Sequence, residues 1–329
     1  MPSRWGIFRQ GEFPAAVAAA ALAFYIRWVH PPRIIDDAFI TFRYAVNLAG
    51  GQGFVYNPGE YVLGTTTPLY TLFLTLGVWL AGADALPAFS TALNALFDAG
   101  TVVLLILLAR GLKLHWMAGG ALGILFAISD KSVIFSVGGM ETSVFLFFLT
   151  GTAAFLMMER PALSMASGAL AVLTRPDGLV LVLLAMLAWC LHRRKFDRSL
   201  IRSLLIFAVP VGLWAVFSWF YFGSPLPNSI AAKRLAYSSD VKWWQLFQEF
   251  LQHGPGTVFG YSGLGSSGRL WMLLGHIALF GLGSAGMIAR RPLAWFIPVF
   301  PVAYALALSA GSPFLFHWYV MPFVLFLLV

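Results

Sequence analysis

Two adjacent carboxylates, Asp36 and Asp37, follow the first apolar segment of a chain in which 60 % of the residues are hydrophobic and only 10 % are charged. An ionised side chain deep in a bilayer costs about 2.5–3.5 kcal/mol on insertion scales. Acids in such a chain therefore lie on a wet loop or line a site that uses them. A positioned carboxylate can act as a general base, because it draws a proton from a hydroxyl group as that oxygen forms a new bond.

Helical spacing relates these acids to a nearby arginine. In a helix that begins at Asp36, Arg43 lies on the same face, about 10.5 Å further along the axis. Such a pair could span a sugar phosphate, with Arg43 holding the phosphate through two hydrogen bonds. Asp37 projects about 100° away, on the side of Thr41. The alternative is that Asp36 is a helix N-cap and Asp37 a first-turn acid favoured by the helix dipole. Spacing alone does not decide between the two.

A second group of polar residues interrupts later apolar runs. The segment LTRPDG places Arg175 and Asp177 between two apolar stretches that are each short for a membrane span. Asp177 can bond to the backbone of a turn that contains Pro176, whereas Arg175 has no such local role. Function is therefore favoured for Arg175. Glu141, in GGMET, stands at the outer end of a span, where an acid at a helix start is the alternative to a functional role.

Two further segments place polar side chains beside prolines or aromatic residues. In SPLPNSIAAKR, Asn228 can cap the helix that follows, and Lys233 could contact a lipid headgroup or a substrate phosphate. In HWYVMPF, His317 and Tyr319 stand at a membrane boundary, where aromatic residues commonly form a belt. A lone histidine is more often structural than catalytic. We treat all four as candidates for substrate binding.

The elements that must position these residues are membrane helices. A mean hydropathy of +0.81 is far from the composition of soluble proteins, in which about 25 % of residues are charged. We expect an all-α polytopic membrane protein with one domain over residues 1–329. Apolar segments fall at residues 13–29, 68–82, 88–109, 117–129, 142–157, 162–174, 178–191, 201–221, 271–289, 293–310 and 319–329.

The distribution of basic residues predicts the topology. The segment HRRKFDR is the strongest cytoplasmic marker, because short loops rich in Lys and Arg stay inside. Counting back from it puts the N-terminus inside and requires an even number of crossings before Ala109, although three apolar segments lie there. We predict that Pro68–Leu80 is a re-entrant or interfacial helix on the outer side, which leaves about nine or ten transmembrane helices. Outer loops then span residues 31–87 and 222–270, and all the polar candidates fall on the outer side.

Composition also argues against several function classes. The net charge of +8 accumulates in the predicted cytoplasmic loops, so topology explains it and nucleic-acid binding is not needed. The single Cys190 excludes disulfides within the chain and zinc sites of the cysteine-cluster type. The first apolar segment lacks a convincing cleavage site and is expected to be an uncleaved helix. Because the sequence ends at Val329 inside an apolar run, we expect a truncated C-terminus or an unusually short last helix.

Taken together and in this order, the motifs resemble the GT-C superfamily of integral-membrane glycosyltransferases, which use polyprenyl-phosphate sugars. The resemblance is to the bacterial branch that contains terminal arabinofuranosyltransferases and related mannosyltransferase-like proteins. It covers roughly residues 33–322 and rests on DDAFITFRYAVNLAGGQGFVYNPGE, GTTTPLYTLFL, GGMETSVF, LTRPDGLVL, PLPNSIAAK and HWYVMPF. The first block is long and fairly specific, and the later ones are short.

The resemblance implies a site on the extracytoplasmic face of a bacterial plasma membrane, with a polyprenyl-phosphate sugar as donor and a glycan, lipid or protein as acceptor. Asp36 or Asp37 would be the general base that deprotonates the acceptor hydroxyl. The polyprenyl phosphate would leave from the anomeric carbon, with inversion. Arg175, Lys233 and Arg43 would neutralise the phosphate leaving group.

The resemblance leaves a cofactor and two departures open. Some relatives use a divalent metal, for which Asp36, Asp37 and Glu141 could supply oxygen ligands; spacing does not establish this. Many relatives carry a soluble domain after the last helices, which does not appear in these 329 residues. The late motif also has His317 where an arginine is frequent, so phosphate binding there is in question.

Two other functions compete with the enzyme. One is a secondary transporter or lipid flippase, whose buried charges would form a translocation path through the membrane. A transporter should bind its substrate at the midplane between repeats, whereas here the polar candidates share one face and no repeat is evident. The other is a non-catalytic partner subunit of the same superfamily.

Overall fold

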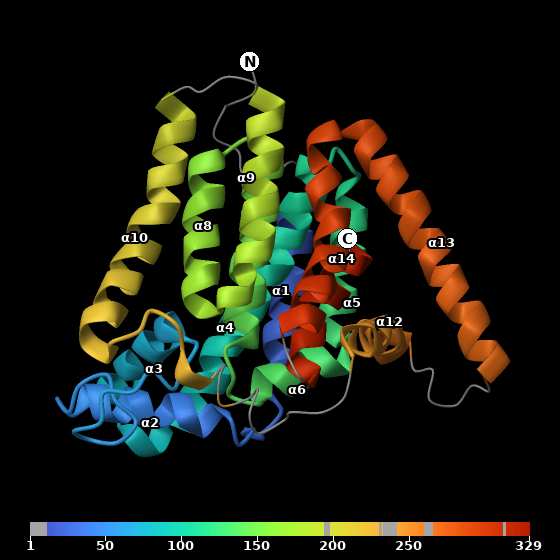
Figure 1. The fold of residues 1–329 in the computed structure, drawn as a ribbon. Helices are drawn as coiled ribbons and strands as arrows, with labels where there is room; N and C mark the ends of the chain where they lie inside the picture. Colours follow the sequence, from blue (N-terminus) through green and yellow to red (C-terminus); the bar gives the residue numbers. More distant parts are fainter. Residues whose placement is uncertain (1–11, 194–197, 230–231, 233–241, 260–265, 312–313) are drawn as a thin grey trace.

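The described part of the chain is built of helices and comprises residues 12–193, 198–229, 232, 242–259, 266–311 and 314–329. This computed structural model has no strand in those residues, so the predicted all-α class is confirmed (Figure 1). Its α-helices are α1 (Glu12–Trp28), α2 (Ala38–Ala49), α3 (Pro68–Ala81), α4 (Leu86–Gly111), α5 (Trp116–Ile128), α6 (Asp130–Val137), α7 (Thr142–Met157), α8 (Pro161–Thr174), α9 (Leu179–Arg193), α10 (Arg198–Phe222), α12 (Trp243–Phe259), α13 (Ser266–Arg290), α14 (Phe296–Gly311) and α15 (Val320–Leu328). Short 3₁₀ helices precede four of them: η1 (Ala83–Ala85), η2 (Pro176–Gly178), η4 (Pro292–Trp295) and η5 (His317–Tyr319).

The helices follow the apolar segments of the sequence closely, and α7 has the bounds that the sequence predicts. Five described helices are long and apolar enough to cross a membrane, or six if the bent pair α5–α6 counts as one span. This is fewer than the nine or ten that we expected. Several expected spans are short: α7 and α8 have 16 and 14 residues. At 1.5 Å per residue they reach about 24 and 21 Å, less than the roughly 30 Å hydrocarbon core.

One helix has no counterpart in the sequence prediction. The chain bends by 57° between α5 and α6. Asp130 and Lys131 begin α6 and interrupt the apolar pattern, so hydropathy alone does not predict it. Helix α6 ends at Val137 and therefore sets the start of the loop that carries Glu141.

The two ends of the bundle differ. In Figure 1, α2 lies across the lower end of the upright helices, with α3 beside it, and α12 lies at the same end. The end of α9 and the start of α10, which flank the most basic loop, lie at the opposite end. Helices α2 and α3 therefore lie together at one end of the bundle, and the basic link from α9 to α10 lies at the other.

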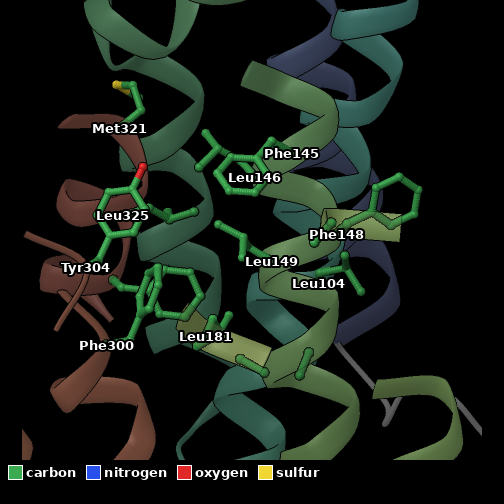
Figure 2. Close-up of a cluster of buried hydrophobic side chains, with 14 of the residues drawn as sticks. Leu104, Phe145, Leu146, Phe148, Leu149, Leu181, Phe300, Tyr304, Met321 and Leu325 are labelled. Atoms are coloured by element: carbon green, nitrogen blue, oxygen red, sulfur yellow. The ribbon is translucent and has the colours of Figure 1, made fainter. Parts of the chain in front are cut away.

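Helix α4 is at the centre of the packing and contacts α1, α5 and α7. Lipid tails are as apolar as leucine side chains, so close packing and polar contacts, more than burial, hold membrane helices together. Gly119 allows α5 to approach α4, because a Cβ there would lie 2.7 Å from the Cα of Ile106. Figure 2 shows a second packed region, in which buried side chains of α7, such as Phe145, lie opposite those of α14 and α15, such as Phe300 and Leu325.

Two long helices lie at the edge of the bundle. Only 11 % of the apolar window of α10 and 6 % of that of α13 are buried. Their exposed side chains are large and apolar, for example Phe220, Trp271 and Leu282. These helices suit contact with membrane lipids, and the chain is a multi-pass membrane protein.

Candidate active site

A cavity of about 110 Å³ lies at the end of the bundle that carries α2 and α3. We call it the Asp37 cavity, and its lining comes from six separate segments of the chain. The lining residues are Asp37, Ile40, Thr41, Gly64, Thr65, Thr66, Thr67, Met140, Glu141, Arg175, Ser229, Trp318 and Tyr319. Asp37, Glu141, Arg175 and Tyr319 are all candidates that the sequence predicts, so the fold brings these four together.

Arg175 is buried between carboxylates in the link from α8 to α9. Its Nη1 donates to Oε1 of Glu141 at 3.1 Å. Its Nε and Nη2 donate to Oδ1 and Oδ2 of Asp177 at 3.1 and 2.9 Å. The hydroxyl of Tyr304 donates to the same Oδ2 at 2.6 Å, and the guanidinium lies 4.7 Å from the ring centroid of Tyr319. Arg175 thus joins the loops before α7, α9 and α15 into one cluster.

Arg175 stays protonated, and some of its N–H groups remain available as hydrogen-bond donors. Burial acts to lower the pKa of Arg175, but Asp177 and the other acidic groups around it outweigh burial and hold this pKa well above its usual range. A guanidinium has five N–H donors, and the contacts with carboxylates use three of them. One N–H on Nη1 and one on Nη2 remain. Arg175 can therefore donate to a bound oxygen without giving up its ion pairs.

The two adjacent aspartates differ in position. Helix α2 begins at Ala38, two residues later than predicted, so both acids lie in the turn before it. Asp37 lines the cavity, whereas Asp36 is exposed and does not. Oδ1 of Asp36 accepts a hydrogen bond from the backbone N–H of Asp37 at 2.9 Å. Asp37 makes no side-chain cap for α2, so helix capping does not account for the acid that faces the cavity.

Two fully buried side chains fix the loop that leads to Glu141. The side-chain amide of Asn94, on α4, donates to the carbonyl of Met140 at 2.8 Å. The hydroxyl of Tyr70, on α3, donates to the carbonyl of Gly139 at 2.9 Å. Gly139 has a φ of +74°, in the left-handed region that favours glycine. Glu141 follows Met140, so these contacts position its backbone, and Arg175 holds its carboxylate.

The same loop also positions the aspartates. The backbone N–H groups of Arg33 and Ile35 donate to the carbonyls of Val137 and Gly138, each at 3.0 Å. Asp37 follows Ile35 by two residues. One loop therefore positions Glu141 directly and Asp37 through backbone pairing.

Hydroxyl groups form the part of the cavity next to Asp37, a feature for which the sequence offered no role. Oγ1 of Thr67 lies 2.9 Å from that of Thr65 and 3.3 Å from that of Thr41. Thr41 follows Asp37 by four residues and lies on its side of the chain, as predicted. The Oγ of Ser229 is buried and has no hydrogen-bond partner among the described residues. Because threonine and serine are common in loops, no sequence pattern singles these residues out.

Arg43 lies outside the cavity, on the exposed face of α2. Its Nε donates to the carbonyl of Tyr56 at 2.8 Å, and its Nη2 donates to Oδ1 of Asn57 at 2.9 Å. The guanidinium also lies over the ring of Tyr56, 4.4 Å from its centroid. In this structure Arg43 holds the loop after α2.

The remaining candidates are spread around the cavity. Asn228 is exposed, and its backbone N–H donates to the carbonyl of Leu63 at 2.8 Å. His317 is exposed on η5. Asp177 does not line the cavity but holds Arg175 from behind. Lys233 lies outside the described residues.

The acids considered as metal ligands do not form a ligand set. No group of three or more His, Cys, Asp or Glu side chains suited to a metal ion occurs among the described residues. Asp37 and Glu141 line the same cavity, but Asp36 does not, and Glu141 already accepts a hydrogen bond from Arg175.

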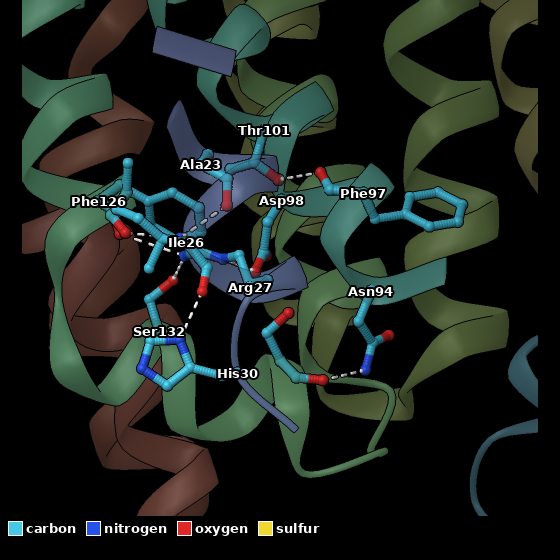
Figure 3. Close-up of polar contacts among 12 residues, drawn as sticks. Ala23, Ile26, Arg27, His30, Asn94, Phe97, Asp98, Thr101, Phe126 and Ser132 are labelled. Carbon is cyan, nitrogen blue, oxygen red and sulfur yellow. Dashed lines mark hydrogen bonds and ion pairs between the residues drawn. The ribbon is translucent and has the colours of Figure 1, made fainter. Parts of the chain in front are cut away.

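A second buried ion pair, which the sequence did not lead us to expect, lies between α1 and α4 (Figure 3). Nε of Arg27 donates to Oδ2 of Asp98 at 2.7 Å, and the two side chains are 0 % and 1 % exposed. The rest of the guanidinium donates to the carbonyls of Phe126 and Ala127 and to the hydroxyl of Ser132, at the α5–α6 bend. The carbonyl of Ala127 lies in the last turn of α5, where carbonyls lack a partner from the helix itself. The sequence feature that could have indicated this ion pair is Arg27 itself, a charged residue within the apolar segment 13–29.

These features define a multi-pass membrane protein with an acidic, arginine-containing cavity at one end of its bundle.

None of the protein-family models matches the chain. Its sequence is similar to two enzymes named terminal beta-(1->2)-arabinofuranosyltransferase. The one from Mycobacterium tuberculosis is 28 % identical over 302 residues, covering 85 % of this chain and 45 % of that protein. The one from Corynebacterium glutamicum is 26 % identical over 327 residues, covering 84 % and 44 %. The chain thus spans less than half the length of these relatives.

A solved structure has the same fold. The crystal structure of ArnT from Cupriavidus metallidurans, bound to undecaprenyl phosphate, superposes with a TM-score of 0.63. The match covers 98 % of this chain and 59 % of ArnT, at 16 % sequence identity, so it concerns the fold. Sequence and fold together confirm the resemblance to the GT-C glycosyltransferases.

Proposed function

We propose that this protein is a glycosyltransferase that moves a sugar from a polyprenyl-phosphate donor to an acceptor hydroxyl outside the cytoplasm. The observation that carries the proposal is the Asp37 cavity, in which a carboxylate and a buried, charged arginine meet at one end of a membrane bundle. A site there lets a lipid tail stay in the bilayer while the acceptor arrives from water. The names of the two relatives make an arabinofuranosyl group the first sugar to test.

In this mechanism Asp37 is the general base. Its carboxylate accepts the proton of the acceptor hydroxyl while that oxygen bonds to the anomeric carbon of the donor sugar. The bond between the anomeric carbon and the phosphate oxygen breaks in the same step, so the configuration inverts and polyprenyl phosphate leaves. The position of Asp37 in the cavity lining favours it over Asp36, which bonds to the backbone of its neighbour.

Arg175 supplies positive charge to the reaction. Its two remaining N–H groups can donate to an oxygen that gains negative charge as the donor bond breaks, and such preorganised donors are commonly a large part of catalysis. Glu141 and Asp177 fix the guanidinium from two sides, and Tyr319 packs against its face. Roles of Arg43, Asn228, Lys233 and His317 in binding the donor or acceptor remain predictions from the sequence.

We assign the cavity to the extracytoplasmic side of a bacterial plasma membrane, with the N-terminus in the cytoplasm. The support is that α2 and α3 lie at one end of the bundle and the basic link from α9 to α10 lies at the other (Figure 1). Loops rich in Lys and Arg stay inside. The acceptor would then be a glycan, lipid or protein of the cell envelope.

A transporter or lipid flippase is less well supported. The feature that would favour it is the buried Arg27–Asp98 pair, because charges inside a membrane bundle often mark a translocation path. That arginine is fully bonded to the bundle itself, however, whereas the cavity with available donors lies at one end.

The experiment that tests the proposal is transfer of radiolabelled sugar by the wild-type protein in liposomes, from a panel of polyprenyl-phosphate sugars that includes arabinofuranose. We expect transfer to added acceptor from at least one donor, and parallel reactions with EDTA show whether a metal contributes. Movement of labelled lipid across the bilayer, without transfer from any donor, would instead support the flippase.

A further inference from the structure

We propose that four hydroxyl groups, those of Thr41, Thr65, Thr67 and Ser229, bind the sugar ring of the donor in the Asp37 cavity. We call these four residues the hydroxyl wall. The inference rests on the proposed function and extends it, since it names the part of the substrate that this wall takes. The donor phosphate then lies outside the wall.

The charges around the cavity favour a neutral polyol over a phosphate. Asp37 and Glu141 line the cavity, and Asp177 forms an ion pair with Arg175. Three carboxyl groups therefore surround a single guanidinium group. A phosphate at the hydroxyl wall, next to Asp37, would be repelled by that carboxylate, so the side of the cavity that Arg175 lines is left for the phosphate. Sugar hydroxyls, in contrast, can donate to the carboxylate of Asp37 and accept from the hydroxyls of the wall, which leaves the remaining N–H groups of Arg175 for the phosphate oxygen.

The hydroxyl wall has hydrogen-bonding capacity to spare. Thr41, Thr67 and Thr65 form a chain of three hydroxyls joined by two hydrogen bonds, so one O–H proton remains for another acceptor. Oγ of Ser229 is buried without a partner among the described residues, a state that is costly until a ligand supplies one. At least two hydroxyl donors therefore await a bound molecule.

The geometry of an inverting displacement agrees with this division. The attacking oxygen and the leaving phosphate must lie on opposite sides of the anomeric carbon. Asp37, as the base, stands on the side of the attacking oxygen, and Thr41 lies one helical turn from Asp37. A phosphate bound at the hydroxyl wall would be on the side of the base. A sugar ring bound there leaves the phosphate directed away from it.

The test is direct binding of two lipids to the purified protein, without turnover. One is polyprenyl-phosphate arabinofuranose, and the other is polyprenyl phosphate with the same chain length. Thr67→Val and Ser229→Ala remove a hydroxyl with little change in volume. We expect each to weaken binding of the sugar lipid about three- to tenfold and to leave binding of the sugar-free lipid unchanged.

Thr75→Val is the matched control. It removes a buried hydroxyl from α3 that donates to the carbonyl of Thr71 in its own helix at 2.8 Å. We expect it to change the affinity for neither lipid. Unfolding temperatures of all three variants show that the fold is kept.

Three results would overturn the inference. Equal losses for both lipids would mean that the wall binds phosphate, and no loss for either would make it structural. Equal affinity of the wild type for both lipids would mean that no sugar ring is bound there. Selective binding of the sugar lipid without any transfer would contradict the proposed enzyme activity but support sugar binding by the hydroxyl wall. Transfer by the wild type, with donor binding unchanged in the variants, would support the enzyme activity but contradict sugar binding by the wall.

Discussion

The described part of the chain buries two arginines beside carboxylates, Arg27 and Arg175, and their N–H groups have different partners. Arg27 makes five hydrogen bonds, to Asp98, to three backbone carbonyls and to Ser132, which is one for each N–H of a guanidinium. Arg175 bonds to carboxylates through three of its five and lines a cavity. Burial and ion pairing are common to both, so neither marks a functional arginine. Arg175 differs from Arg27 in that two of its N–H groups remain beside a cavity, and its proposed role rests on this difference.

The largest expected effect is on stability, at Arg27. Arg27→Met leaves Asp98 buried without its partner, which typically costs about 3–5 kcal/mol. We expect a large drop in unfolding temperature and in the yield of detergent-purified protein. Removing both charges in Arg27→Met/Asp98→Leu should recover part of that loss. An unchanged unfolding temperature in the single variant would contradict the structural role.

The matched change at Arg175 should act mainly on catalysis. Arg175→Met removes the donors of the cavity, and we expect sugar transfer to fall about 10²–10³-fold. Its unfolding temperature should fall less than that of Arg27→Met, because water in the cavity can hydrate Glu141, one of the two carboxylates left behind. Transfer near the wild-type rate would make the two arginines alike and remove the distinction.

Titration of Arg175 should not affect the rate of sugar transfer near neutral pH. Its pKa is held well above the usual range, so its charge and the stability of its ion pairs are lost only as pH rises through that high value. We therefore expect no loss of activity from this group between about pH 6 and 9. A rate profile that falls in this range in the wild type but not in Arg175→Lys would contradict this.

A smaller effect is expected from the residues that fix the loop before Glu141. Tyr70→Phe leaves the carbonyl of Gly139 buried without its partner, at a cost of about 1–3 kcal/mol. Because the loop positions the acids, we expect a lower kcat with little change in KM. Tyr25→Phe, at an exposed tyrosine of α1, is the control. A loss of stability with unchanged kcat would limit Tyr70 to a structural role.

The smallest effect is expected at Arg43. Its hydrogen bonds hold an exposed loop, and exposed interactions of this kind contribute less than about 1 kcal/mol. We expect Arg43→Gln to change neither the unfolding temperature nor the affinity for polyprenyl phosphate appreciably. A tenfold loss of that affinity would restore the phosphate role that helical spacing suggested.

Hydropathy predicts most of this fold because helix bounds in a membrane follow apolar runs. Residues 142–157 became α7 without a shift, and 201–221 lie within α10. It fails where charge and helix coincide, as at Asp130 in α6. It does not distinguish long spans from short ones: among the described residues, five helices are long enough to cross a membrane, and four shorter helices are also apolar.

The site was partly predictable for the same reason. Asp37, Glu141 and Arg175 stand out because charges are rare in an apolar chain. The hydroxyl wall does not stand out, because Thr67 and Ser229 acquire a role only through long-range packing. The pair of Arg27 and Asp98, 71 residues apart, depends likewise on how α1 meets α4.

The most direct measurement compares sugar transfer and donor binding in Asp37→Asn and Asp36→Asn. Asp84→Asn, at an exposed acid of η1, serves as control. Loss of a general base typically costs about 10²–10⁴ in rate. We expect Asp37→Asn to bind donor like the wild type and to lose transfer by that factor, while Asp36→Asn and Asp84→Asn retain it. Transfer retained in Asp37→Asn would contradict the assignment of the cavity as the catalytic site.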